Sequence, residues 1–335
     1  MIKEALSELA LGRDLDVDSM VKVMDEIMSG EATTAQIGAF LMGLRNKGET
    51  VDEITGAARV MREKAKKISP PGPCIDTCGT GGDNSLTFNI STTAAFVVAG
   101  GGVVVAKHGN RAASSASGSA DVLSALGVNI EATPETVEKC LKEVGIGFLF
   151  APSLHGAMRF AIGPRRELGF RTIFNVLGPL TNPAGASRQL LGVFSPDLTE
   201  VMAKVLGNLG SEAALVVHGL DGLDEVTLTG PTRVSELKDG KVTTYEINPE
   251  DFGIDACHRD DLLGGDPQEN ARLTLEVLKG REGRKLDITA MNAGAALYAA
   301  GLADSIADGI KKAYDIVASG KAMEKLDSLI EASRE

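Results

Sequence analysis

Tryptophan is absent from this 335-residue chain, and the aromatic share is only 4%. With so few rings, the core must be filled by aliphatic side chains, alanine and glycine, a composition that suits helices packed closely on a parallel sheet. Cysteine is also scarce, at four residues: Cys74, Cys78, Cys140 and Cys257. Their spacing makes no zinc signature, so we expect free thiols in a reducing compartment.

Basic residues are outnumbered by acidic ones, 34 to 46, which gives a net charge of −12. An acidic chain is a poor nucleic-acid binder, and to bind a polyanionic small molecule it needs a metal cation or local lysine and arginine. The longest apolar stretch, residues 94–106, is broken by glycines and is shorter than the ~20 residues of a membrane span. The N-terminus has no signal-peptide core. We therefore expect a cytoplasmic protein with no nucleic-acid partner and no membrane association.

The sequence pattern changes near residue 70. Before it, apolar residues recur at helical spacing, and Thr33 with Gln36 and Thr50 with Glu53 fit capping boxes. A proline-rich linker, residues 69–73, follows. Beyond it short aliphatic runs alternate with amphipathic segments, which predicts an α/β fold with a mostly parallel sheet. The predicted strands are 103–106, 147–150, 190–194 and 213–217, and the predicted helices are 112–126, 199–209, 268–279, 289–300 and 302–318.

A further helical segment, residues 165–177, interrupts the alternation and is closed by Gly178 and Pro179. Two interpretations remain open at this point. The segment either returns to pack on the N-terminal helices or is a local irregularity of the α/β pattern.

The first chemical motif runs from Cys78 to Asp83 and on through residues 87–93. Its glycines let the backbone approach a ligand closely, and the helix that follows offers unpaired N–H groups to an anion. The motif lacks the lysine of a Walker A loop and the spacing of a Rossmann fingerprint. A simple tight turn with one N-cap would leave most of its polar side chains without a role. We therefore interpret it as a phosphate or pyrophosphate site.

The second motif, residues 107–119, directly follows the predicted strand 103–106, at the end where open α/β sheets bind ligands. Lys107 supplies a charge for phosphate, and the serines supply hydroxyls. The third motif, residues 221–225, places Asp224 and Glu225 in a loop after strand 213–217. Such a pair suits Mg²⁺, although a solvated surface pair is the commoner case. A fourth candidate, Arg165, is able to hold a carboxylate through its guanidinium.

Together these segments resemble the anthranilate phosphoribosyltransferase family, within the nucleoside phosphorylase-like phosphoribosyltransferases. The resemblance covers nearly the whole chain and includes residues 79–83, 89–92, 107–119 and 175–183, Arg165, and the pair Asp224 and Glu225. It implies a small helical domain, residues 1–68 with about 165–185, which forms a homodimer. It also implies a larger α/β domain, residues 73–164 and 186–335, that binds phosphoribosyl pyrophosphate.

The implied reaction is Mg²⁺-dependent transfer of 5-phosphoribose from phosphoribosyl pyrophosphate to the amine of anthranilate, a step of tryptophan biosynthesis. The resemblance implies that Ser91, Asp224 and Glu225 position the metal, and that Gly79, His108, Asn110, Arg165 and Gly178 face anthranilate. It assigns no certain catalytic residue, although His108 is a candidate late proton acceptor. The residues implied for phosphoribosyl pyrophosphate are Gly79, Gly82, Asp83, Thr87, Asn89, Ile90, Ser91, Thr92, Lys107, His108, Gly109, Asn110, Arg111, Ala112, Ala113, Ser114, Ser115 and Ser119.

Two alternatives share this fold. A pyrimidine nucleoside phosphorylase would use inorganic phosphate and lack the Asp224–Glu225 pair. A non-enzymatic nucleic-acid-binding relative would need a basic groove and salt-sensitive binding, which the net charge of −12 disfavours.

Overall fold

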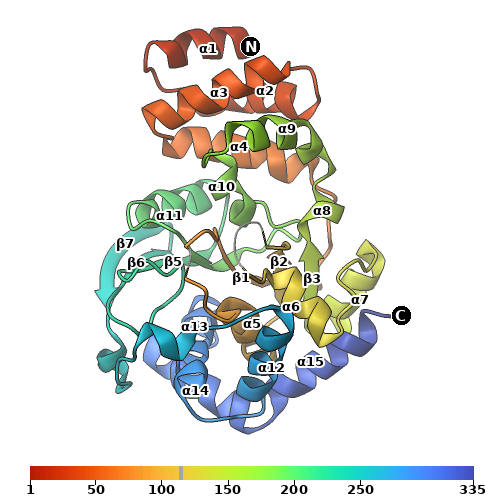
Figure 1. Ribbon diagram of the computed structural model, residues 1–335, viewed down its shortest axis with the longest axis vertical. Coiled ribbons are helices and arrows are strands. Elements are labelled where there is room, and N and C mark those ends of the chain that lie inside the picture. The colour runs from red at the N-terminus through yellow and green to blue at the C-terminus, as the bar shows by residue number, and fades with distance from the viewer. Residues whose placement is uncertain (84, 113–115) are drawn as a thin grey trace.

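The computed structural model describes residues 1–83, 85–112 and 116–335. Helices α1 (Ile2–Ala10), α2 (Val17–Met28), α3 (Thr34–Lys47) and α4 (Val51–Lys64) form a bundle at one end of the molecule (Figure 1). Both predicted capping boxes are confirmed, at Thr33 with Gln36 and at Thr50 with Glu53. Glu53 is fully buried, and its carboxylate also accepts from the Leu15 amide at 2.9 Å and pairs with Lys47 at 3.0 Å. One capping side chain therefore fixes three segments of the bundle.

The segment predicted as one helix over 165–177 is two helices, α9 (Arg159–Leu168) and α10 (Phe174–Leu177). Gly169 ends α9 in the left-handed conformation, and this turn separates the two. Helix α9 contacts α2 and α3, and α10 contacts α4. The first of the two interpretations is therefore right: this later part of the chain returns to the N-terminal bundle (Figure 1).

The rest of the chain builds one seven-stranded sheet in the order β3-β2-β1-β4-β5-β6-β7. The first five are parallel: β1 (Ile75–Gly79), β2 (Val105–Gly109), β3 (Ile146–Phe150), β4 (Arg188–Gly192) and β5 (Ala213–Gly219). Strands β6 (Thr232–Lys238) and β7 (Lys241–Ile247) form an antiparallel hairpin on the edge, which the sequence analysis missed.

The remaining helices alternate with the strands or cover them. They are α5 (Ile90–Gly100), α6 (Ser119–Leu126), α7 (Pro134–Glu143), α8 (Ala151–Leu154), α11 (Leu198–Asn208), α12 (Pro267–Leu278), α13 (Arg284–Ala299), α14 (Ile306–Ala318) and α15 (Lys321–Ala332). The predicted helix 112–126 was wrong at its start, because α6 begins only at Ser119. Asp121 in its first turn accepts from the amides of Ala112 and Gly118, at 2.8 and 3.0 Å, and so closes a loop ahead of the helix. Within the part of the chain that the structure describes, no helix has the length and apolar character of a membrane span.

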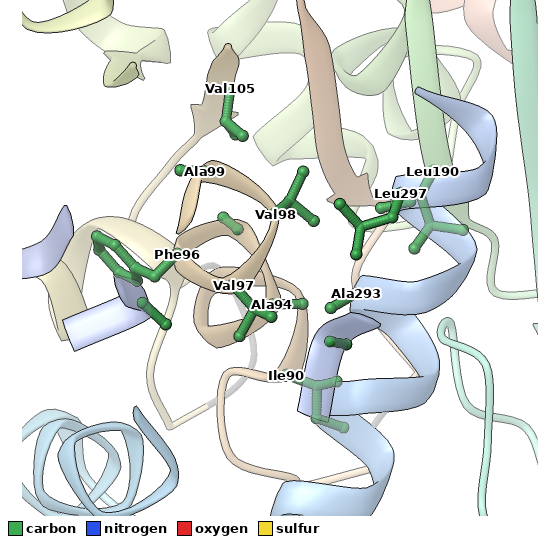
Figure 2. Close-up of a cluster of buried hydrophobic side chains, with 14 of the residues drawn as sticks. Ile90, Ala94, Phe96, Val97, Val98, Ala99, Val105, Leu190, Ala293 and Leu297 are labelled. Atoms are coloured by element: carbon green, nitrogen blue, oxygen red, sulfur yellow. The ribbon is translucent and has the colours of Figure 1, made fainter. Parts of the chain in front are cut away.

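Successive strand residues point to opposite faces of the sheet, and each face packs into an apolar core. One face, with Leu190 and Leu215, packs on α5 and α13, where Val98, Ala293 and Leu297 meet (Figure 2). The other face, with Leu191 and Val216, joins α11 and continues without a break into the bundle. The bundle and the sheet are thus connected by one apolar core as well as by the chain.

Candidate functional site

The centre of the sheet is the point at which the strand order reverses. From β1 the chain proceeds outward to β2 and β3, and then returns to β4 on the other side. Ligands of open α/β sheets bind at the carboxyl ends of strands at such a switch point. Gly79 and Gly192 are the terminal residues of β1 and β4, and they are paired in register. The residue after β1, Thr80, donates its amide to the Gly192 carbonyl at 2.9 Å.

The loop that follows β5 lies over these two glycines. A Cβ atom at Gly79 would overlap the Asp224 carboxylate, and one at Gly192 would overlap the Asp224 main chain. The Asp224 carboxylate accepts from the Gly81 amide at 2.8 Å, and the Glu225 carboxylate accepts from the Ser91 amide at 3.0 Å. The third motif is therefore no surface pair: it joins the glycine loop to the start of α5.

Three carboxyl groups gather here. Burial raises the pKa of Asp224 well above its usual range, and the neighbouring Asp83 and Glu225 carboxylates raise it further. Burial also raises the pKa of Glu225 to about 8, against the opposing effect of Lys107. Among the described residues, none forms a hydrogen bond with the buried oxygen Oδ2 of Asp83. Half-buried carboxylates that repel one another, with one oxygen unpartnered among those residues, fit a divalent cation.

The donor set fits Mg²⁺ in particular. Within the described residues no group of three or more His, Cys, Asp or Glu side chains is arranged as a ready-made metal cage. Mg²⁺ commonly dispenses with such a cage, because it keeps several waters and takes its other oxygens from one or two carboxylates and substrate phosphates. Asp224, Glu225 and the hydroxyl of Ser91 would serve in this way, as the resemblance implies.

A buried cation lies behind the carboxylates. Lys107, on β2, is 3% exposed and donates from Nζ to the Thr77 carbonyl at 2.6 Å. Burial lowers its pKa, which the negative charges of Asp76 and Glu225 partly offset. Asp76 in turn accepts from the His108 amide at 3.1 Å and from the Asn182 side chain at 2.7 Å. The sequence predicted that Lys107 follows its strand, but Lys107 lies within β2, which extends to Gly109, and is held there in a fixed hydrogen-bond network.

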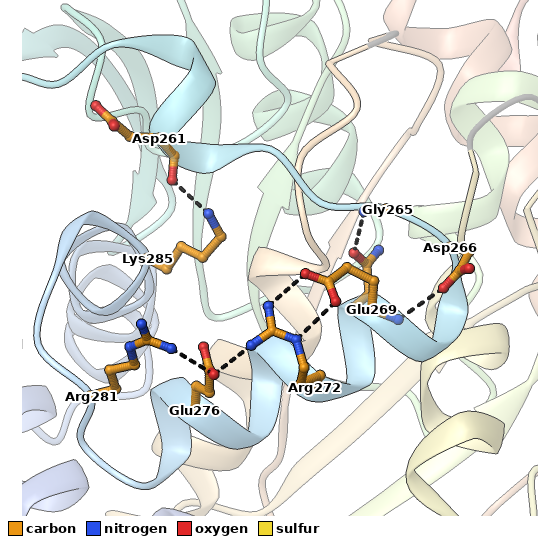
Figure 3. A network of polar contacts seen from close by, with 9 residues as sticks. Asp261, Gly265, Asp266, Glu269, Arg272, Glu276, Arg281 and Lys285 are labelled. Atoms are coloured by element: carbon orange, nitrogen blue, oxygen red, sulfur yellow. Dashed lines mark hydrogen bonds and ion pairs between the residues drawn. The ribbon is translucent and has the colours of Figure 1, made fainter.

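The start of α5 is tied to two other segments by Asn89. Its side chain donates to the Ser117 carbonyl at 3.2 Å and accepts from the Asn270 side chain at 2.9 Å. Asn270 lies on α12, whose first turn is capped by Asp266 and whose outer surface carries the ion pairs of Arg272 with Glu269 and Glu276 (Figure 3). Asn89 makes no capping bond of its own to α5. The first turn of α5 is therefore left without a side-chain cap from that residue, which suits an anion site.

The other residues of this loop that are predicted to bind phosphoribosyl pyrophosphate differ in how far their side chains are buried. Thr87 forms an isolated bridge with Leu263, and its hydroxyl lies 3.2 Å from that of Ser85. The side chains of Ile90 and Thr92 are buried, and Ile90 belongs to the core beneath the site. Its amide already donates to the Phe88 carbonyl at 2.8 Å. Ile90 thus contributes to the shape of the helix start more than to contacts with a ligand.

The second motif forms a loop whose turns depend on close packing. A Cβ at Gly109 would overlap the Ser119 hydroxyl, and one at Gly118 would overlap the Ala112 amide. Arg111 pairs with Asp121 at 3.2 Å and lies over the Phe150 ring. The exposed Asn110 holds the start of α6 through its carbonyl, which accepts from Ala120 at 3.1 Å. Ala113, Ser114 and Ser115, also predicted to bind phosphoribosyl pyrophosphate, lie outside the described residues.

The opposite side of the site contains two histidines. Nε2 of His108 lies 3.1 Å from Nε2 of His155, a residue that follows α8, and both rings are buried. Burial lowers the pKa of His108 to about 3 and that of His155 to about 4, so both rings are neutral near pH 7. The His108 ring also forms a hydrogen bond with the backbone of Gly178, at the end of α10. This pair therefore presents an uncharged, partly aromatic surface.

Arg165 lies on α9, the helix that follows His155 in the chain. Its guanidinium stacks over the Phe174 ring at 5.1 Å, at the start of the helix that ends beside Gly178. Burial lowers its pKa without depriving it of charge. The four cysteines are free thiols; burial raises the pKa of Cys74 to about 12 and raises that of Cys78 well above its usual range.

Sequence reasoning missed three residues of this region: Asn270, His155 and Arg171. His155 follows the carboxyl end of β3, so the rule that led to Lys107 would also have found it. Asn270 and Arg171 gave no such signal, because their partners are about 90 or more positions away in the chain.

Comparisons with known proteins agree with this geometry. The helical bundle domain of a glycosyl transferase family matches residues 3–65, and the a/b domain of a glycosyl transferase family matches residues 71–323. Anthranilate phosphoribosyltransferase of Acetivibrio thermocellus is 55% identical over 332 residues, which cover 99% of this chain and 96% of that protein. The enzyme of the same name from Syntrophotalea carbinolica is 52% identical and covers 98% of this chain and 99% of its own length.

Solved structures give the same result. The crystal structure of anthranilate phosphoribosyltransferase from Thermus thermophilus is similar with a TM-score of 0.93 and 45% identity, and covers 99% of each chain. The enzyme from Saccharomyces cerevisiae in complex with PRPP and Mg is similar with a TM-score of 0.90 and 29% identity. That match covers 99% of this chain and 98% of the yeast chain.

Proposed function

The chain belongs to the glycosyl transferase family whose helical-bundle and a/b domains match it, and from that premise we propose that its sheet-end site makes N-(5-phosphoribosyl)anthranilate. The chain transfers the 5-phosphoribosyl group of phosphoribosyl pyrophosphate to the amine of anthranilate and releases pyrophosphate. This is the step of tryptophan biosynthesis that follows anthranilate formation from chorismate. The observation that carries the assignment is the Asp224–Glu225 pair seated over Gly79 and Gly192 at the switch point.

Mg²⁺ is the cofactor. Bound here, it would neutralise the charge that gathers on pyrophosphate as the bond to the ribose carbon breaks. Ser91, Asp224 and Glu225 would hold it, and the unpartnered oxygen of Asp83 faces the same carboxylates. A cation would also keep Glu225 deprotonated near pH 7, because it favours the charged form of a carboxylate.

The remaining residues of the two loops hold the phosphates. The N–H groups around Gly82, the Lys107 ammonium, and the loop from Gly109 to Ser119 surround the switch point. Thr87, Asn89, Ser91 and Thr92 line the α5 side, and Asn110, Arg111 and Ala112 line the α6 side. Backbone donors of this kind are already oriented before the reaction, so they stabilise developing charge without reorganisation.

Anthranilate faces the uncharged side of the site. His108, Asn110 and Gly178 provide the walls, with Gly79 between the two substrates, and Arg165 pairs with the anthranilate carboxylate. The aromatic amine attacks without prior deprotonation, so orientation matters more than a strong base. With a pKa of about 3, neutral His108 is a weak proton acceptor, and it serves the late proton transfer only in that limited sense.

The helical domain, residues 1–68 with about 165–185, also forms the homodimer of a cytoplasmic enzyme. Leu11 and Met42 support this assignment, because both are large apolar residues exposed on the bundle, at 65% and 49%. Sedimentation equilibrium should give twice the chain mass. A Met42→Lys variant should shift the equilibrium toward the monomer, and a fully monomeric unmodified chain would exclude the proposal.

Loss of anthranilate fluorescence tests the reaction directly. The chain with phosphoribosyl pyrophosphate and Mg²⁺ should consume anthranilate and release pyrophosphate in equal amounts. Phosphate-dependent cleavage of thymidine or uridine, with no pyrophosphate release, would instead favour a pyrimidine nucleoside phosphorylase.

An Arg165→Ala variant tests the acceptor side. We expect the KM for anthranilate to rise about 10- to 100-fold, because a bidentate charged bond is lost. The KM for phosphoribosyl pyrophosphate should change little. The exposed neighbour Arg166, changed to Ala, is the matched control, and an equal effect of both changes would refute the role of Arg165.

A further inference from the structure

Arg171 lies in the short turn between α9 and α10 and contacts two strand ends of the α/β domain. Its Nη2 donates to the carbonyl of Gly82, and its guanidinium stacks on the Phe194 ring at 4.1 Å. Phe194 follows β4, and its amide donates to the Thr80 hydroxyl at 3.1 Å. Arg171 therefore connects the segment that returns to the helical bundle with both sides of the glycine loop.

The glycine loop needs such a restraint. Gly81 and Gly82 have φ angles of 66° and 77°, in the left-handed region that glycine adopts without strain. Two adjacent glycines have many other conformations available, and fixing each residue costs about 1–2 kcal/mol of conformational entropy. The loop is held from one side by the Asp224 carboxylate, which accepts from the Gly81 amide at 2.8 Å. Arg171 holds the Gly82–Asp83 peptide by its carbonyl.

We infer that Arg171 is a positioning residue, which keeps the Gly81–Gly82 turn in the shape that binds phosphoribosyl pyrophosphate. With the Gly82 carbonyl engaged by the guanidinium, that oxygen is kept from turning toward the phosphates, which it would repel. The inference rests on the proposed function and adds to it a residue of the bundle side that acts on the pyrophosphate side.

Both contacts of Arg171 require the planar guanidinium group of arginine. A lysine carries the same charge, but its compact ammonium lacks the planar group that stacks on a ring and donates at its edge at the same time. Gly82 itself leaves little room, because a Cβ there would lie 3.0 Å from Nη2. The prediction is therefore specific to the guanidinium and does not extend to positive charge in general.

The experiment compares Arg171→Lys and Arg171→Gln with the exposed control Arg166→Gln. Calorimetric titration with phosphoribosyl pyrophosphate and Mg²⁺ should show the Kd of both Arg171 variants raised about 10- to 100-fold, because small displacements of a binding loop have effects of this size. Steady-state kinetics should show a matching rise in the KM for phosphoribosyl pyrophosphate, with the KM for anthranilate within about twofold. Added guanidinium chloride at low millimolar concentration should partly restore binding by Arg171→Gln.

The outcomes separate the inference from the proposed function. If the unmodified chain binds phosphoribosyl pyrophosphate without consuming anthranilate, the proposed function is refuted. The calorimetric titration still tests the role of Arg171 in that case. A Kd within about twofold of the unmodified chain in both Arg171 variants would overturn the inference. So would equal losses for both substrates together with a lower melting temperature and no rescue by guanidinium, since these indicate a purely structural role.

Discussion

The two sides of the site differ in how they are built. The side that we propose binds pyrophosphate consists of backbone amides and charged groups near neighbouring strands: Lys107, Asp224, Glu225 and the turn at Gly81 and Gly82. The proposed acceptor side consists of side chains, namely two neutral histidines and the stacked Arg165, carried by segments at residues 108, 155, 165 and 178.

This difference reflects the chemistry of the two substrates. A polyanion is held by preoriented N–H groups and a cation, and the carboxylates that recruit the cation repel one another until it arrives. A planar aromatic acid needs a neutral, shaped surface and one cation for its carboxylate. In the proposed arrangement, charged groups surround the leaving group, and the surface that contacts the aromatic ring is neutral.

The strongest test of this contrast removes the charge from one side. Replacing Asp224 and Glu225 together by Asn and Gln should lower turnover about 1,000-fold and abolish its dependence on Mg²⁺, because charge stabilisation is lost at the leaving group. Fluorescence assays across Mg²⁺ concentrations measure both effects. The exposed Glu246→Gln, on β7 of the same sheet, is the control. Unchanged Mg²⁺-dependent kinetics in the double variant would refute the metal role.

A smaller effect is expected from crowding the same carboxylate without changing its charge. In Gly79→Ala the new Cβ would displace the Asp224 side chain, so kcat/KM for phosphoribosyl pyrophosphate should fall about 10- to 100-fold. Gly230→Ala is the matched control, because nothing lies within 4 Å of a Cβ there. Equal kinetics for the two variants would show that the fit between β1 and Asp224 is unimportant.

The pH dependence of stability should have opposite signs on the two sides. Glu225 has a folded-state pKa of about 8, above the 4.5 of an exposed glutamate. The folded chain therefore keeps a proton that the unfolded chain releases, and this stabilisation is lost as the pH rises toward 8. In EDTA, the free energy of unfolding of the unmodified chain should fall by about 2 kcal/mol more than that of Glu225→Gln between pH 6 and pH 8. Urea unfolding measures it, and parallel pH curves would contradict the assignment.

His155 should give the smallest effect, with the reverse sign. Its folded-state pKa of about 4 lies below the ordinary 6.5, so its contribution is present above pH 6.5 and is lost as the pH falls toward 4. Between pH 7 and pH 5.5 the unmodified chain should lose about 1 kcal/mol more stability than His155→Gln. The exposed His258→Gln serves as the control in the same urea titrations, and a matching change in that variant would show that burial is not the cause.

Sequence patterns predicted the loops at the strand ends better than the contacts between distant segments, for a physical reason. Parallel strands bring their carboxyl ends to one edge, so a local rule applied to each strand in turn placed Asp224 in the loop after β5, although Lys107 lies within β2 and not after it. The bond between Arg171 and Gly82 spans 89 positions, and no local rule relates two such residues. The edge hairpin β6–β7 was missed because its alternating residues carry many polar side chains on one face.

The helix at residues 112–126 was misplaced for a related reason. Alanines and serines favour a helix locally, but the Asp121 carboxylate engages the amides ahead of it and holds the chain in a loop. These local hydrogen bonds between a side chain and the backbone overrode the helix propensity of the sequence.

One apolar core runs from the helical bundle to one face of the sheet, so the two domains cannot be separated by a single cut in the chain. Two separate parts of the chain build the bundle. The later part, α9 and α10, covers surfaces of α2, α3 and α4 that the N-terminal helices leave open. A fragment cut after residue 68 would therefore carry the four helices but not their covering. The contiguous stretch that matches the helical bundle domain is thus not a complete structural unit. The helices that complete it follow about a hundred residues later, within the sequence of the other domain.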